Sequence, residues 1–240
     1  MKGISKMNVV ILLSGGSGLR FGADVPKQHF VMNEHQIIEY TLLAFSSCDA
    51  VDAILVVSNV QYMEKFDAHK VFFPKLKWVV AGGTTRIHSA FNAIKFLQDK
   101  CSDNDYVIVS DGARPCITHR EINELYIQLK DYKAATTAIP SYETILKTEE
   151  GIVKDLIPRD GIARQTSPEA YRYGVLKDLY LYTNDDMDSY RNIGIDQLVA
   201  KGEKVSVVQS NIFNFKITTH EDLFMFEYVL KKGFDEIIKN

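Results

Sequence analysis

Residues 9–18 have the sequence Val-Val-Ile-Leu-Leu-Ser-Gly-Gly-Ser-Gly, so that an apolar run ends directly in a glycine-rich loop. The apolar part shows no polar alternation, which is typical of a strand buried on both faces, as in a parallel sheet covered by helices. Four glycines occur from Gly15 to Gly22, and they let the backbone approach a ligand closely and turn successive N–H groups toward an anion. This junction predicts a central strand that ends in a phosphate-binding loop.

Similar apolar runs recur along the chain and alternate with helical patterns. Within residues 87–97 and again within 122–132, apolar side chains recur at the spacing of one helical face. Strands separated by such helices indicate right-handed βαβ units. We therefore expect the α/β class, with a single Rossmann-like domain over residues 1–240 whose mainly parallel sheet is flanked by helices. The expected strands are residues 9–13, 54–57, 78–80, 106–109 and 134–139.

The pattern changes after Pro140. Residues 144–157 contain two short apolar runs around Glu149-Glu150-Gly151, which predicts a β-hairpin. We expect this hairpin to project as a dimerisation arm at about residues 141–165. Further helices are expected around residues 174–182 and 188–201, and a strand at 204–208. Lys216 is expected at the end of the last strand, before a helix that Thr219 caps.

The composition argues against several classes of partner. The chain has 28 Lys and Arg residues against 31 Asp and Glu residues, so its balanced charge does not favour nucleic acid or an anionic membrane. Its three cysteines form no C-x-x-C pair and its six histidines show no zinc-binding spacing, which argues against a disulfide framework or a zinc site. No apolar run approaches the roughly 18 residues of a membrane span, and no signal-peptide core is present. We expect a cytoplasmic protein with no nucleic-acid or membrane partner.

Charged residues gather at the expected carboxyl ends of the strands, where open α/β sheets bind ligands. Arg20 and Lys27 flank the glycine loop, and Asp111 ends another strand. A carboxylate beside a phosphate loop is a suitable ligand for Mg²⁺, which prefers carboxylate and phosphate oxygens. The loop is neither a P-loop nor a good dinucleotide fingerprint, because the residues that those motifs require are missing.

Each of these segments also has a structural interpretation. The glycine loop and the Asp111-Gly112 pair can be ordinary turns, and Thr84 or Thr85 can simply cap a helix. Arg159 and Lys216, taken singly, are typical of solvated surface charges. The order and spacing of the segments, taken together, decide between the two interpretations.

In that order the segments resemble the cytidylyltransferases that form CDP-polyols, whose best-known members act on 2-C-methyl-D-erythritol 4-phosphate or ribitol 5-phosphate. The resemblance extends from Val9 to about Leu230. It is carried by the loop from Gly15 to Arg20, Pro26-Lys27-Gln28, Gly82-Gly83 with Arg86 and Ser89, Asp111-Gly112-Ala113-Arg114-Pro115, Arg159, and Lys216-Ile217-Thr218.

The resemblance implies a homodimeric enzyme that transfers CMP from CTP to the phosphate of a small polyol phosphate with Mg²⁺. Cations suit this reaction because negative charge is concentrated as two phosphates are joined. The catalytic residues would be Arg20, Lys27, Arg159 and Lys216, and Asp111 would be the metal ligand. The CTP-binding residues would be Ser14, Gly15, Gly16, Ser17, Gly18, Gly83, Thr84, Arg86, Ser89 and Asp111, and the acceptor-binding residues Thr144 and Ser167.

The sequence departs from the family pattern on the acceptor side. Ser167 and Glu169 stand where the family has the Thr and Gln of Thr-Pro-Gln, and Ser110 replaces a His. The methylerythritol enzymes' Thr-Asp-(Asp/Glu) segment appears only as Asn184-Asp185-Asp186. The acceptor therefore stays open, as does its pathway, isoprenoid precursor or surface polysaccharide. Two alternatives remain, a nucleotide-sugar-dependent glycosyltransferase and a non-catalytic nucleotide sensor.

Overall fold

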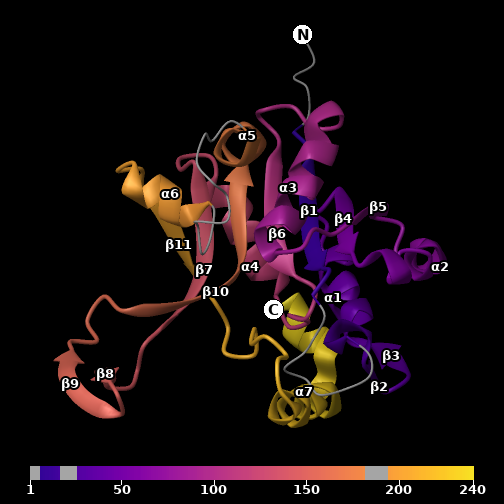
Figure 1. Ribbon diagram of the computed structural model, residues 1–240. Helices are drawn as coiled ribbons and strands as arrows, with labels where there is room; N and C mark the ends of the chain where they lie inside the picture. The colour runs from indigo at the N-terminus through magenta and orange to yellow at the C-terminus, as the bar shows by residue number, and fades with distance from the viewer. Residues whose placement is uncertain (1–5, 17–25, 182–193) are drawn as a thin grey trace.

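The computed structural model describes residues 6–16, 26–181 and 194–240 (Figure 1). Within these residues a seven-stranded sheet has the strand order β11-β7-β10-β6-β1-β4-β5. All neighbouring strands are parallel except β10, which is antiparallel to both β6 and β7. The expected α/β fold with a mainly parallel sheet is confirmed. The strands are β1 (Asn8–Ser14), β4 (Ala53–Ser58), β5 (Leu76–Ala81), β6 (Tyr106–Asp111), β7 (Ala134–Pro140), β10 (Ala163–Arg172) and β11 (Val205–Gln209).

Strand β1 shows why its apolar run has no alternation. Val10 and Leu12 belong to the core on one face of the sheet, and Val9 and Ile11 belong to the core on the other. Successive side chains of a strand point to opposite faces, so a strand covered on both sides must be apolar at every position. All four side chains are fully buried.

Helices cover both faces of the sheet. The first core contains side chains of α1 (Ile37–Ser46), α4 (His119–Gln128) and α7 (His220–Lys239). The second contains side chains of α3 (Arg86–Phe96), α5 (Tyr173–Leu181) and α6 (Ile195–Ala200). α2 (Lys65–Phe72) also contributes Phe66 to the first core, and the short strands β2 (Val31–Met32) and β3 (His35–Gln36) form a separate two-stranded sheet. No helix in the described ranges is long and apolar enough to cross a membrane.

The last two helices, α6 and α7, can be compared with the bounds predicted from the sequence. Thr219 and Asp222 form a capping box at the start of α7, as expected from the sequence, and Gly233 with a φ of 105° interrupts this helix. The expected helix at residues 188–201 is confirmed only for Ile195–Ala200, because residues 182–193 lie outside the described part of the chain.

Strand β10 is the strand of the seven-stranded sheet that the sequence did not predict. It lies between β6 and β7, yet its segment Thr166-Ser167-Pro168-Glu169 is polar and contains a proline. The register with β7 shifts between Gln165 and Glu169. Thr166, Ser167 and Glu169 are buried, and their side chains form hydrogen bonds instead of packing in an apolar core. Hydrophobic pattern therefore gives no indication of this strand.

Residues 144–157 form the expected hairpin, which extends away from the sheet (Figure 1). β8 (Ile145–Glu149) pairs with β9 (Ile152–Ile157) through Glu150 and Gly151, which both have positive φ as a tight two-residue hairpin turn requires. Leu146, Ile152 and Val153 are about half exposed in this single chain, at 49%, 61% and 52%. The hairpin thus presents apolar side chains that the chain itself does not cover.

The prediction that Lys216 lies at the end of the last strand is wrong. The last strand, β11, ends at Gln209, and Lys216 lies in an irregular segment between β11 and α7. Phe215 and Ile217 flank Lys216 with the alternation of a strand, but the Ile217 N–H donates to the carbonyl of Ala113, beyond the end of β6. This segment therefore crosses the carboxyl edge of the sheet without extending it.

We expect Ile11→Ala to lower the free energy of unfolding by about 2–5 kcal/mol, because it opens a cavity in the core between the sheet and the helices that cover one of its faces. Urea unfolding followed by circular dichroism measures the change. Val207→Ala on β11, where the side chain is 61% exposed, is the matched control and should change stability by less than about 0.5 kcal/mol. Equal losses in the two variants would contradict the placement of β1 at the centre of the core.

Candidate active site

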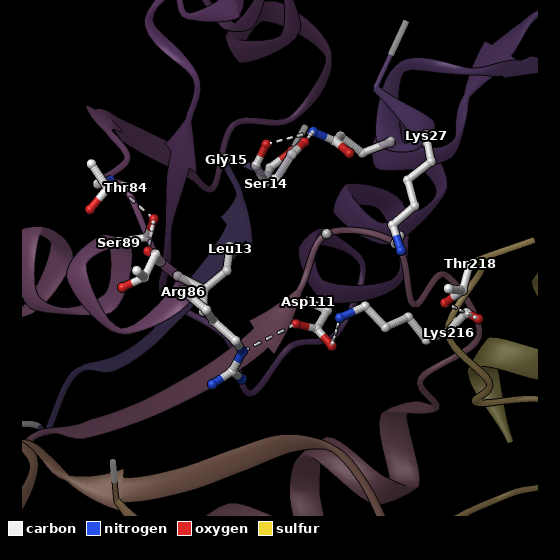
Figure 2. A pocket seen from close by; sticks show the side chains of 16 residues that line it. Leu13, Ser14, Gly15, Lys27, Thr84, Arg86, Ser89, Asp111, Lys216 and Thr218 are labelled. Carbon is white, nitrogen blue, oxygen red and sulfur yellow. Dashed lines mark hydrogen bonds and ion pairs between the residues drawn. The ribbon is translucent and has the colours of Figure 1, made fainter. Parts of the chain in front are cut away.

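A cavity of about 530 Å³ lies at the carboxyl edge of the sheet, where β1 and β6 end (Figure 2). It brings together most of the residues that the sequence analysis assigned to the nucleotide and to catalysis. Ser17, Gly18 and Arg20 lie outside the described residues. The assigned residues that line the cavity are Ser14, Gly15, Gly16, Lys27, Gly83, Thr84, Arg86, Ser89, Asp111 and Lys216.

Gln28 shapes the glycine loop on one side of the cavity. Its Nε2 donates to the carbonyl oxygens of Ser14 at 2.7 Å and Gly16 at 3.0 Å. These two bonds engage carbonyl oxygens of the loop and so fix its course at the end of β1. Gln28 belongs to the motif Pro26-Lys27-Gln28, but the sequence alone indicates no role for it. Only its place beside Lys27 could have drawn attention to it.

Ser89 holds the loop after β5 against the start of α3. Its hydroxyl accepts from the N–H of Gly83 at 3.0 Å and donates to the carbonyl of Thr85 at 2.9 Å. A Cβ on Gly83 would lie only 2.4 Å from the Cβ of His88, so a glycine is required for this close approach. The result is a compact wall opposite the glycine loop.

Asp111 is the electrostatic centre of the cavity. Its Oδ2 accepts from Lys216 Nζ at 3.0 Å and lies 3.3 Å from Arg114 Nε, while its Oδ1 lies 3.6 Å from Arg86 Nε. Figure 2 shows the Asp111 carboxylate between the head groups of Arg86 and Lys216. Burial acts to raise the pKa of Asp111, but Lys216, Arg86 and Arg114 together outweigh it and lower this pKa to about 2. Asp111 is therefore ionised at neutral pH.

Ser167 lies behind Asp111 rather than in the lining of the cavity. It is buried, its hydroxyl accepts from the N–H of Asp111 at 3.3 Å, and it lies 3.4 Å from the hydroxyl of Ser110. In this structure Ser167 therefore supports the strand end that carries Asp111. Its assigned role in acceptor binding stays a prediction.

Glu169 forms a buried polar cluster on the same strand. It accepts from Gln165 Nε2 at 2.8 Å and from the hydroxyl of Tyr171 at 2.6 Å. Burial acts to lower the pKa of Arg86, but the negative charges of Asp111 and Glu169 raise it above its ordinary value. The charge that replaces the family's amide therefore stabilises the cationic form of Arg86.

Arg159 and Thr144 are not brought to this cavity within one chain. Thr144 directly precedes β8, and Arg159 donates from its guanidinium to the carbonyl of Tyr142 at 2.9 Å. Arg159 lines a second cavity of about 590 Å³ at the base of the hairpin. Both residues thus lie on the arm or at its base.

The described residues can hold Mg²⁺ only with help from a substrate. No group of three or more His, Cys, Asp or Glu side chains converges among them. Asp111 supplies one ionised carboxylate that lines the cavity, and its Oδ1 lies 3.6 Å from Arg86 Nε. Mg²⁺ is commonly bound by one or two carboxylates together with substrate phosphates and water, so this donor set fits that ion.

A glycine loop, several cations and a carboxylate at one sheet edge define a site of the nucleotidyl-transfer type. Residues 8–232 match the family model described as 2-C-methyl-D-erythritol 4-phosphate cytidylyltransferase (IspD). The chain belongs to this family, and the resemblance seen in the sequence is confirmed. Its class of activity is accordingly that of a nucleotidyltransferase, and more narrowly of a cytidylyltransferase.

The chain is similar both to relatives named for 2-C-methyl-D-erythritol 4-phosphate and to a relative named for ribitol 5-phosphate. It is 37% identical over 232 residues to the 2-C-methyl-D-erythritol 4-phosphate cytidylyltransferase of Thermosipho africanus, covering 97% of this chain and 99% of the relative. It is 32% identical over 236 residues to the ribitol-5-phosphate cytidylyltransferase of Lacticaseibacillus paracasei, covering 94% and 99%. The crystal structure of Francisella tularensis 2-C-methyl-D-erythritol 4-phosphate cytidylyltransferase superimposes with a TM-score of 0.74 at 28% identity, covering 93% and 99%.

We expect Asp111→Asn to destabilise the fold in a pH-dependent way. Because the pKa of Asp111 falls from its ordinary 3.8 to about 2 on folding, its contribution is complete above about pH 4 and disappears as the pH falls toward 2. The gap in unfolding free energy between wild type and variant should be about 2 kcal/mol at pH 7 and should narrow below pH 4. Urea unfolding at a series of pH values measures it.

Asp131→Asn provides the control, since Asp131 is an exposed carboxylate in the turn after α4. It should show almost no gap at any pH. A gap for Asp111→Asn that stays constant from pH 7 to pH 3 would contradict the ionic account of this residue.

Proposed function

We propose that the enzyme transfers CMP from CTP to the phosphate of a small polyol phosphate, giving a CDP-polyol and pyrophosphate. The observation that carries this proposal is the cluster of Lys216, Arg114 and Arg86 around one buried carboxylate, opposite the glycine loop and Lys27. A site that joins two phosphates needs cations on both, because the anions repel each other as they approach. The cluster and Lys27 meet this need from two sides of the cavity.

The transfer requires no covalent intermediate. An oxygen of the acceptor phosphate attacks the α-phosphorus of CTP, the bond from that phosphorus to the bridging oxygen breaks, and pyrophosphate leaves with the electron pair. Lys27 and Arg20 would neutralise the charge that accumulates at the α-phosphate, and Lys216 would hold the acceptor phosphate. Asp111 and the phosphate oxygens of CTP would hold Mg²⁺, which when bound supplies further positive charge to the triphosphate.

The wall formed by the loop after β5 supports a nucleotide site that prefers pyrimidine bases. Ser14, Gly83, Thr84 and Ser89 would surround cytosine and ribose. Because Gly83 lies so close to His88, the wall cannot move outward to enlarge the cavity, which disfavours the larger purines. We assign CTP to this side of the cavity.

The acceptor is a polyol phosphate, either 2-C-methyl-D-erythritol 4-phosphate or ribitol 5-phosphate, and relatives named for each support both. The two differ by a methyl branch and by chain length, which changes binding by only about 1–3 kcal/mol per contact. The test is pyrophosphate release with CTP and Mg²⁺ held constant and each polyol phosphate offered in turn. Turnover with one acceptor at least tenfold above the other assigns the substrate, and turnover with neither would overturn the proposal.

We further propose that residues 1–240 act as one catalytic domain and that the arm at residues 141–165 joins two copies in the cytoplasm. Isolated two-stranded hairpins are marginally stable unless they pack on something, and a second hairpin across a two-fold axis would cover the exposed Leu146, Ile152 and Val153. Arg159 and Thr144 would then reach the acceptor side of the neighbouring subunit. The buried free thiols of Cys48 and Cys116 support a reducing location.

The alternative of a glycosyltransferase has little structural support. Such an enzyme would usually have an Asp-x-Asp motif after a strand in the middle of the chain. Asp103-Asn104-Asp105 has this pattern, but Asp105 precedes β6 and accepts from the N–H groups of Met7 and Ser102. Asp105 therefore serves a local turn at the opposite end of β6 from Asp111. A nucleotide sensor would need no second cationic site beside the glycine loop, so the acceptor test also separates that alternative.

We expect Lys27→Ala to lower kcat about 10²–10³-fold and to change the KM for CTP far less, because the charge matters most when the α-phosphate becomes five-coordinate. Steady-state pyrophosphate release measures both constants. Lys95→Ala, on the exposed side of α3, is the matched control and should keep the wild-type rate. An unchanged kcat in Lys27→Ala would remove Lys27 from the catalytic assignment.

We expect Arg159→Lys to raise the KM for the polyol phosphate strongly and that for CTP little, since a lysine cannot grip a phosphate with two parallel hydrogen bonds. Mixing inactive Arg159→Ala with inactive Lys27→Ala should restore up to about a quarter of the wild-type rate, because a mixed dimer holds one intact site. Subunit exchange without any return of activity would show that the site is built within one chain.

A further inference from the structure

The segment that carries Lys216 belongs to no strand or α-helix. Residues 210–218 lie between β11 and α7 outside any strand or α-helix, and yet Lys216 Nζ reaches Asp111 Oδ2 at 3.0 Å. A flexible segment would have to be ordered each time the lysine is used, at a cost of about 1–2 kcal/mol per residue. Specific contacts must therefore set the course of this segment.

Asn214 supplies the central contacts. It is fully buried, and its Nδ2 donates to the carbonyl of Ser167 at 2.8 Å and to the hydroxyl of Ser210 at 3.1 Å. The first bond fastens the segment to β10 directly beneath Asp111, whose N–H donates to the Ser167 hydroxyl. The second fastens it to the start of the segment itself.

The backbone of Asn214 holds a second cation. Its carbonyl oxygen accepts from the Nη1 of Arg114 at 2.8 Å, while the Nε of the same guanidinium lies 3.3 Å from Asp111 Oδ2. Lys216, two residues further along, contacts that same carboxylate oxygen. One residue thus lies at the junction of both cations that share Asp111 Oδ2.

The contacts around Asn214 extend to a rigid support. The hydroxyl of Ser210 donates to Oε1 of Glu121 at 2.5 Å, and Glu121 also accepts from Asn211 and Thr118. Glu121 is fully buried in the capping box of α4. The position of Asn214 is therefore tied to a helix start on one side and to β10 on the other.

The side-chain oxygen of Asn214 is buried and has no hydrogen-bond partner among the described residues. An unsatisfied buried acceptor costs about 1–3 kcal/mol, and such a group in a folded protein requires an explanation. The explanation here is that the two N–H donors of Asn214 Nδ2 anchor the segment to Ser167 and Ser210. An apolar residue would avoid the cost and lose both anchors.

We propose that Asn214 is a positioning residue for nucleotidyl transfer, whose buried amide holds the segment that sets Lys216 and Arg114 on Asp111, so that Lys216 is ready for the acceptor phosphate. This role rests on the proposed function of Lys216. It differs from a purely structural role because it predicts a defect confined to the acceptor side. Lys27 and the glycine loop belong to other elements, so the handling of CTP stays intact.

The test compares Asn214→Ser with Asn211→Ser, a matched amide in the same segment. Asn211 donates to Glu121 and to the carbonyl of Cys116, away from the cavity. Asn214→Ser should lower kcat/KM for the polyol phosphate about 10–100-fold and change the KM for CTP less than about threefold. Asn211→Ser should lower the Tm and leave both kinetic constants within about twofold of wild type.

A double-mutant cycle with Lys216→Ala decides whether Asn214 acts through the lysine. In the Lys216→Ala background, Asn214→Ser should cost less than about threefold in kcat/KM, because the group that it positions is already gone. Losses that multiply, or a Tm defect with wild-type kinetics, would overturn the proposal. An inactive wild-type enzyme would instead contradict the proposed function, and so the two failures are distinguishable.

Ser210→Ala is the second variant if Asn214→Ser does not fold. It removes one of the two acceptors of the Asn214 amide and leaves the bond to Ser167 in place. We expect a smaller loss in the same acceptor-side constant, which disappears in the Lys216→Ala background. An equal loss in both backgrounds would contradict the positioning role.

Discussion

Three cations share one buried carboxylate at the carboxyl edge of the sheet, and the site depends on that arrangement. Arg86, Arg114 and Lys216 come from the start of α3, the turn after β6 and the segment before α7, and each contacts Asp111. Without this carboxylate the three positive charges would repel one another in a partly buried space. With it they stay close together, and the cavity carries a net positive charge that suits phosphates.

The sheet places Asp111 where this arrangement is useful. Leu13 pairs with Asp111 in the register of β1 and β6, and the N–H of Gly112 donates to the carbonyl of Leu13 at 2.9 Å. The glycine loop after β1 and the carboxylate after β6 are therefore neighbours because their strands are neighbours. The antiparallel strand β10 then brings Ser167 behind Asp111 and leads from the arm into the centre of the sheet.

The apolar strands and the nucleotide side of the site could be predicted from the sequence. A run such as residues 9–13, buried on both faces, leaves a plain pattern, and the glycine loop, Lys27 and Asp111 follow strand ends directly. The hairpin was also predictable, because two short apolar runs flank Glu149-Glu150-Gly151. In the structure Glu150 and Gly151 adopt the positive φ of a tight turn.

The remaining parts left no comparable pattern. β10 lies deep in the sheet, but its buried residues are polar and satisfied by hydrogen bonds, so hydrophobic pattern does not reveal it. Lys216 was expected at the end of a strand, whereas contacts distant in the sequence, of Ile217 with Ala113 and of Lys216 with Asp111, decide its place. Gln28 and Asn214 act through backbone carbonyls, which no residue pattern indicates.

A crystal structure of the complex with CTP and Mg²⁺ tests the central claim most directly. The account predicts the triphosphate on the glycine loop, with the N–H groups of Gly15 and Gly16 and the Lys27 ammonium within hydrogen-bond distance of its oxygens. It also predicts that Lys216 and Arg114 stay beside Asp111, with Lys216 on the side left open for the acceptor phosphate. A nucleotide bound elsewhere, or an Asp111 side chain turned away from all three cations, would contradict the account.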